Sequence, residues 1–167
     1  MSESRTNGNR RVVMLGAMGL LVVTVAGYGA WRATSTSGDR IDPKTLVIDG
    51  TMPQARQFMD AYEAITLTPE QEAIRVAALS TIPAMCCQEF SAATCCCECN
   101  LSRAVWGLSK SLIVAGAGEV EVREAAQTWF ATVNPGGYNG DSCFVGGCLR
   151  SMKTDGCGGM NADELIF

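Results

Sequence analysis

Nine cysteines carry most of the chemical information in this 167-residue sequence, and six of them lie close together. Cys86 and Cys87 form a first pair, and a second run at Cys95, Cys96, Cys97 and Cys99 follows it. Bare thiolates at such short spacing repel one another, whereas a shared soft cation or oxidation to disulfides removes that repulsion. The pattern therefore predicts sulfur chemistry, in the form of metal binding, disulfide bonds or thiol–disulfide exchange.

The second run favours a soft metal ion. It contains both a C-x-C spacing (Cys97 and Cys99) and a C-x-x-C spacing (Cys96 and Cys99). Thiolates select Cu(I), zinc and iron–sulfur clusters, and we favour copper. Zinc, an iron–sulfur cluster or no cofactor at all are the alternatives, although neither usual ferredoxin spacing occurs. The leading metal ligands that we predict are Cys95, Cys96, Cys97 and Cys99, with Cys86 and Cys87 as auxiliary ligands.

The main alternative function is a non-catalytic interaction module or an accessory subunit of a membrane complex, stabilised by disulfides. The candidates for disulfide bonds to the cysteine-rich segment are Cys143, Cys148 and Cys157. Adjacent cysteines bond to each other only with strain, so such bonds would reach from the first six cysteines to these three. Three cysteines of the first six would then remain, and an odd total always leaves one thiol unpaired.

The sequence contains no histidine, which excludes several classes of site. Ser-His-Asp and Cys-His catalytic pairs, Cys/His zinc fingers and two-histidine metalloprotease helices all require that residue. A thiol redox function is the second alternative, but a thioredoxin-like C-x-x-C needs a βαβ setting that this pattern lacks. We therefore expect a binding protein rather than an enzyme, with no catalytic residues to assign.

Residues 12–31 form an uninterrupted stretch of twenty uncharged residues between Arg11 and Arg32. A helix of this length spans roughly 30 Å, the thickness of the bilayer core. We predict an uncleaved, single-pass signal anchor with a cytoplasmic tail at residues 1–11, a tether at residues 32–50 and an exported domain at residues 51–167. The C-terminal domain would lie in the periplasm or outside the cell, where disulfides persist.

From Ala33 onward the chain carries nine Lys and Arg against sixteen Asp and Glu, a net charge of 9 − 16 = −7. Such a surface disfavours nucleic acid as a partner. The expected partners are the membrane and a protein or membrane complex.

The exported domain is expected to be mainly α-helical, with a Gly/Cys-rich C-terminal loop. Helices are predicted from Thr51, from Thr68 to Pro83, from Asn100 to about Gly116, and over residues 120–132, with a short strand over Thr45–Ile48. The cysteine-rich segment between Pro83 and Asn100 is expected to be a loop that joins two of these helices. Leu101, Val105, Leu108 and Leu112 repeat on one helical face. Cys97 and Cys99 fall at the start of that helix, where free N–H groups and the helix dipole favour a thiolate.

Overall fold

The computed structural model describes residues 45–167, so the predicted anchor at residues 12–31 lies outside the described part of the chain. Within this part there are four α-helices: α1 Met52–Ala64, α2 Pro69–Ser80, α3 Asn100–Val114 and α4 Glu119–Val133. Two short strands, β1 (Pro83–Ala84) and β2 (Cys87–Ser91), form an antiparallel hairpin between α2 and α3. The mainly helical fold class is thus confirmed. Across residues 45–167, each helix is too short or too polar to cross a bilayer.

The first two helices begin at the threonines that the sequence indicated. Thr68 caps α2: its hydroxyl accepts the Gln71 N–H at 3.3 Å, and the Gln71 side chain accepts the Thr68 N–H at 3.0 Å. Thr51 accepts the Gln54 N–H at the start of α1 in the same way. These bonds satisfy N–H groups that have no partner inside the helix.

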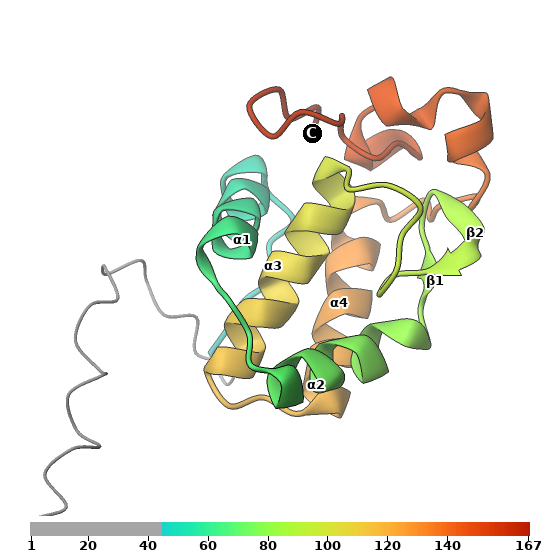
Figure 1. Cartoon of the computed structure of the whole chain (residues 1–167). Coiled ribbons are helices and arrows are strands. Elements are labelled where there is room, and N and C mark those ends of the chain that lie inside the picture. The colour runs from blue at the N-terminus through green and yellow to red at the C-terminus, as the bar shows by residue number, and fades with distance from the viewer. Residues whose placement is uncertain (1–44) are drawn as a thin grey trace, which may run out of the picture. The chain divides into compact units, whose positions relative to one another are not determined.

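Helix α3 forms the centre of the bundle and lies between α1 and α4 (Figure 1). Its predicted apolar face is buried, with Leu101, Val105, Leu108 and Leu112 each at most 3% exposed. Across the bundle, the rings of Phe58 and Trp129 meet edge to face at 5.1 Å. The fully buried Leu108 and Trp129 show that the apolar periodicity drives the packing.

Gly107 sets the close approach of α1 and α3. A β-carbon at this position would overlap the carbonyl group of Phe58, so a side chain would force the helices apart. A glycine inside a helix is normally unfavourable, and here the tight helix contact accounts for it.

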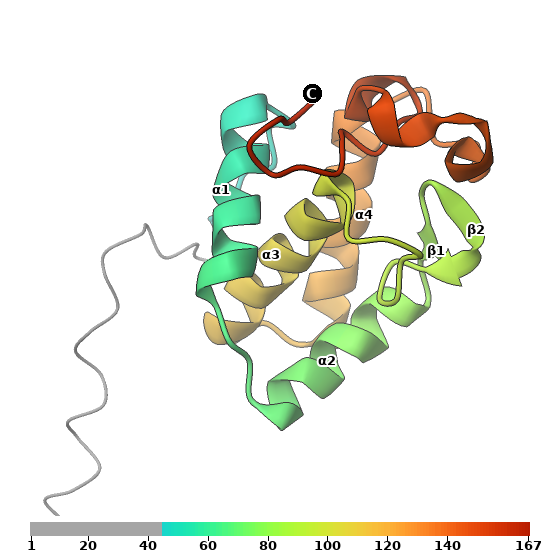
Figure 2. The same cartoon turned by 45° about the horizontal axis from the view of Figure 1, so that its top comes forward.

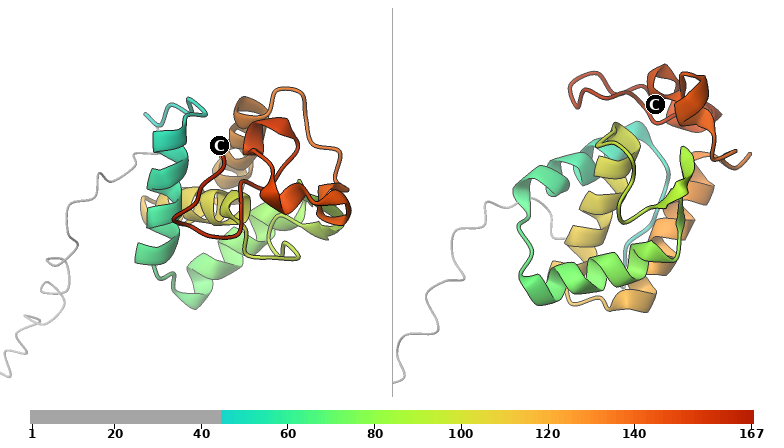
Figure 3. Two further views of the ribbon diagram at one scale, coloured as in Figure 1. Left: turned by 90° about the horizontal axis from the view of Figure 1, so that it is seen from above. Right: turned by 45° about the vertical axis from the view of Figure 1, so that its right-hand side comes forward.

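The C-terminal tail lies over the end of the bundle at which α3 begins, as Figure 2 shows. Its folded parts are three short 3₁₀ helices, η1 (Ser142–Val145), η2 (Gly147–Leu149) and η3 (Met152–Thr154). The views in Figure 3 show the same tail above the start of α3 and beside the β1–β2 hairpin. This arrangement brings the C-terminal cysteines toward the first six.

Two local predictions were wrong. The strand expected over Thr45–Ile48 does not form, because in the described chain the two strands of the hairpin pair only with each other. The segment between the second and third helices, expected to be a loop, contains that hairpin. Its register shifts between Pro83 and Ala84, and the strands are too short for an alternating pattern to reveal them.

Candidate metal centre

Three separate parts of the chain bring cysteines to one place. The hairpin supplies Cys86 from its turn, and the loop between β2 and α3 supplies Cys95, Cys96 and Cys97. Cys99 occupies the N-cap position of α3. The other contributions come from the tail, with Cys143 in η1, Cys148 in η2 and Cys157 beyond η3. All nine cysteines are free thiols.

Backbone hydrogen bonds hold the tail against these segments. The N–H of Cys143 donates to the carbonyl of Cys86 at 3.0 Å, and the N–H of Gln88 donates to Gly140 at 2.8 Å. The first N–H groups of α3 donate to the tail, Asn100 to Gly159 at 2.9 Å and Leu101 to Cys157 at 3.0 Å. The sulfur atoms are thus placed by backbone pairing between distant segments.

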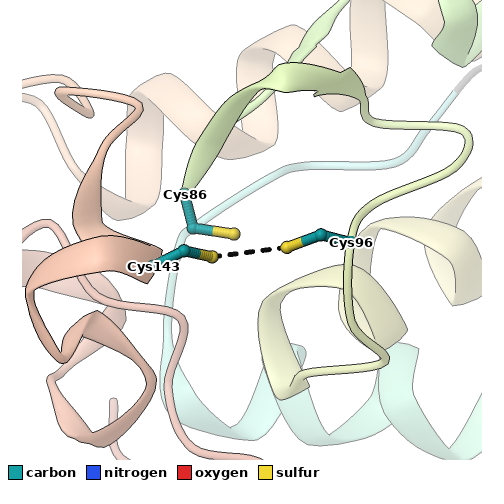
Figure 4. Close-up of side chains that lie close together, drawn as sticks. All are labelled: Cys86, Cys96 and Cys143. Carbon is teal, nitrogen blue, oxygen red and sulfur yellow. Dashed lines mark hydrogen bonds between the residues drawn. The ribbon is translucent and has the colours of Figure 1, made fainter.

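Cys86, Cys96 and Cys143 form the outer sulfur group, whose three Sγ atoms lie within 4.8 Å of one another. The Cys96 and Cys143 sulfurs are 3.4 Å apart, and Figure 4 shows all three side chains pointing toward a common point. Cys96 is exposed and Cys143 half-buried, so this group is accessible from solvent.

Cys86, Cys95 and Cys99 form the inner sulfur group, again with all three Sγ atoms within 4.8 Å. The Cys86 and Cys95 sulfurs are 3.8 Å apart. Cys99 is fully buried and Cys86 is 2% exposed. All three cysteines line a cavity of about 10 Å³, which is close to the space that one water molecule needs. The inner group is therefore a small, largely buried site in which these cysteines lie among apolar side chains.

The remaining four cysteines surround these two groups. Cys97 and Cys157 lie close enough to Cys99 to lower its pKa. Cys148 likewise lies close enough to Cys157, and Cys96 close enough to Cys87, to raise the pKa of Cys157 and of Cys87. All nine thiols therefore belong to one cluster.

One thiol in this cluster is a strong hydrogen-bond acceptor. Hydrogen bonds from Cys157, and then from Cys86, Cys95 and Cys97, lower the pKa of Cys99 well below its ordinary value. The same bond raises the pKa of the donor Cys157, and burial raises it further. The hydrogen bond with Cys86 lowers the pKa of Cys95, but the bond with Cys99 and burial raise it more, to about 12. Negative charge in the metal-free cluster therefore concentrates on Cys99.

The cause of this thiolate preference differs from the one predicted. The helix N-terminus was expected to stabilise thiolates at both Cys97 and Cys99. Instead, the pKa of Cys97 is raised by its hydrogen bond to Cys99, and the N–H groups of Asn100 and Leu101 donate to tail carbonyls. The Cys99 side chain makes no capping hydrogen bond. Neighbouring thiols thus replace the helix dipole as the stabilising groups.

Glu98 interrupts the cysteine run and holds it in place. Its carboxylate accepts a 2.7 Å hydrogen bond from the Tyr62 hydroxyl on α1 and lies 3.8 Å from Arg103 Nε on α3. Burial, and then the hydrogen bond to Glu98, raise the pKa of Tyr62 to about 12. No role was predicted for Glu98 from the sequence. The signal available in the sequence was its position between two cysteines. Neighbouring residues of an extended segment point in opposite directions, so a residue between two ligands can contact the surrounding structure instead of the metal.

Some of the predicted ligands belong to the inner or the outer sulfur group, and others belong to neither. It brings Cys95 and Cys99 into the inner group and Cys96 into the outer group, whereas Cys97 and Cys87 belong to neither. Cys86, expected to be auxiliary, belongs to both. Cys143, expected to form a disulfide, is also a candidate ligand.

Comparison with known protein families, with curated proteins and with solved structures finds no match to this chain. Its function must therefore be inferred from the cysteine cluster itself: the protein is cysteine-rich, and two groups of its thiols could hold a metal ion.

Proposed function

We propose that this protein binds a soft metal ion, most favourably Cu(I), through the cysteine cluster. The convergence of three thiols on one buried point in the inner sulfur group carries this proposal. Sulfurs around a metal at about 2.3 Å lie about 3.8 Å apart in a tetrahedral site and about 4.0 Å apart in a trigonal one. The 3.8 Å between Cys86 and Cys95 matches such an edge.

The composition of the donor set favours copper over the other candidates. The chain offers sulfur without histidine, and thiolates are soft ligands that suit Cu(I). Each group contains three sulfurs, a number that satisfies Cu(I), whereas structural zinc sites use four ligands. The binding step exchanges protons for metal, since each thiol that becomes a ligand releases its proton.

We further propose that residues 12–31 anchor the protein in a membrane, with the cysteine cluster on the extracytoplasmic side. The uncharged stretch between Arg11 and Arg32 supports this location, as does the concentration of all cysteines after it. An acidic domain next to a membrane surface would attract cations electrostatically.

Metal analysis and a thiol count on the full chain test the proposal. The chain is purified in detergent under reducing conditions, loaded anaerobically with Cu(I), and challenged with a competing Cu(I) chelator. Retained copper supports the proposal, and complete transfer of copper to the chelator refutes it. Cys99→Ser should lose the copper held by the inner sulfur group, while Cys148→Ser, a cysteine in neither sulfur group, should retain it.

Because substitution of the buried Cys99 could also unfold the protein, a second variant is needed. Cys95→Ser changes a half-buried ligand of the same inner group, and circular dichroism reports whether each variant keeps its helices. A folded Cys95→Ser protein with undiminished copper affinity would contradict the assignment of the inner group.

The disulfide-stabilised interaction module is the second candidate function. The 3.4 Å approach of Cys96 to Cys143 favours it, since these residues join the cysteine loop to the tail. Three exposed apolar side chains also surround this region of η1 and η2, namely Phe144, Val145 and Leu149. This function predicts about one free thiol in protein purified without reductant, no bound metal in either redox form, and loss of the fold on reduction.

A further inference from the structure

Cys86 belongs to both sulfur groups, and this shared position has a chemical consequence. Its Sγ lies within 4.8 Å of the Cys95 and Cys99 sulfurs on one side and of the Cys96 and Cys143 sulfurs on the other. The two groups therefore comprise five sulfurs rather than six. Cys86 reaches this position because it lies in the turn of the β1–β2 hairpin, with its carbonyl bonded to the N–H of Cys143.

We propose that the cluster holds two Cu(I) ions and that the thiolate of Cys86 bridges them. This inference rests on the proposed copper-binding function. A thiolate sulfur has three lone pairs, so it can donate to two metal ions at once. One ion would bind Cys86, Cys95 and Cys99, and the other Cys86, Cys96 and Cys143.

The distances within the two groups fit two separate ions. The 3.8 Å edge in the inner group and the 3.4 Å edge in the outer group are both near the spacing of sulfurs on a common metal. A disulfide would instead require about 2.05 Å between the sulfurs. The outer pair would have to open slightly to accept an ion, which the exposed position of Cys96 in its loop allows.

Charge and protons balance on loading. One Cu(I) on the three inner thiolates leaves a charge of −2, and Cys96 and Cys143 stay protonated. The second Cu(I) displaces those two protons, so the loaded cluster carries −3. Sharing Cys86 keeps this charge below the −4 of two separate sites with three thiolates each, and burial of Cys86 and Cys99 makes each uncompensated charge costly.

The two ions would differ in accessibility. Cys96 opens the outer group to solvent, while two of the three cysteines of the inner group, Cys86 and Cys99, are buried. A chelator should therefore remove the outer ion first and the inner ion slowly.

The test measures the copper count and the copper–copper distance on the full chain in detergent. Cu(I) is added anaerobically to the reduced protein, the copper retained against a chelator is counted, and X-ray absorption detects scattering between neighbouring copper ions. The expected result is two ions per chain with a copper–copper signal. Cys86→Ser should remove that signal, whereas Cys87→Ser, its equally buried neighbour on the hairpin, should preserve it.

The outcomes separate this inference from the proposed function. One retained ion, three or more ions, or two ions without copper–copper scattering would overturn the bridged pair and leave copper binding intact. No retained copper would overturn both. If Cys86→Ser does not fold, Cys143→Ser provides the second variant: it should retain one ion and lose the copper–copper signal, and two bridged ions in this variant would overturn the assignment.

Discussion

Replacement of Asn100 by alanine should detach the C-terminal tail from α3 and so disrupt the candidate metal centre. Asn100 is fully buried, and its side-chain amide donates to the carbonyls of Gly158 and Asn161, both at 2.8 Å. These bonds fix the stretch of tail that begins at Cys157. The same stretch carries the carbonyls that accept the first N–H groups of α3.

The expected loss in the free energy of unfolding follows from these two hydrogen bonds. Each contributes about 1 kcal/mol to the free energy of unfolding. The two carbonyls keep other partners, because Gly158 also accepts from Ile166 and Asn161 also accepts from Glu164. No buried acceptor is left without a partner, so the expected loss is about 2 kcal/mol. If this loss acts on tail detachment alone, the open population rises about 30-fold.

Two assays measure this effect on the reduced, metal-free chain. Urea unfolding followed by tryptophan fluorescence gives the free energy of unfolding, and alkylation followed by peptide mass spectrometry gives the exposure of Cys157. We expect faster alkylation of Cys157 in Asn100→Ala. Asn134→Ala is the control, because this buried asparagine bonds locally to Gly137 and not to the stretch of tail that begins at Cys157. A stability loss below about 0.5 kcal/mol with unchanged alkylation of Cys157 would show that Asn100 does not hold the tail on α3.

Three further predictions test the fold and the surroundings of the cluster. Gly107→Ala should lower the free energy of unfolding by at least about 1 kcal/mol, since the clash with the Phe58 carbonyl outweighs the gain in helix propensity, and an unchanged melting temperature would contradict this. Tyr62 should ionise near pH 12 in absorbance titrations, and Glu98→Gln should lower that pKa. Because the folded-state pKa lies above 10.0, the stabilisation of the neutral phenol is complete below about pH 10 and is lost as the pH rises through about 12. In reduced, metal-free protein, Cys96 should be alkylated before the buried cysteines, and simultaneous labelling of all nine would argue against the burial of Cys86 and Cys99.

The helices could be predicted from the sequence because their signals are local. The capping box at Thr68 and the apolar repeat from Leu101 to Leu112 each lie within a few turns of one element. The structure adds small residues to that buried face, and Gly107 is the clearest case. A glycine is required at this position because the backbone of Phe58, on another helix, leaves no room for a side chain.

The arrangement of the cysteines could be predicted only in part. The run from Cys95 to Cys99 identified a sulfur-rich loop, but it did not show that Cys86 lies between two groups. That position depends on a hairpin turn and on backbone bonds to Cys143, and any residue type can make such bonds. Similarly, the carbonyls of Cys157 and Gly159 accept hydrogen bonds from the first N–H groups of α3, and no characteristic side chain marks these positions. Sequence patterns report side chains, so these backbone contacts left no signal.

The most direct test of copper binding is a crystal structure of the copper-loaded, reduced full chain, with anomalous scattering to locate the metal. We expect an anomalous peak bounded by the sulfurs of Cys86, Cys95 and Cys99, with sulfur as the only ligand atom. A peak away from these residues, or a cluster without metal in which Cys96 and Cys143 form a disulfide, would contradict it.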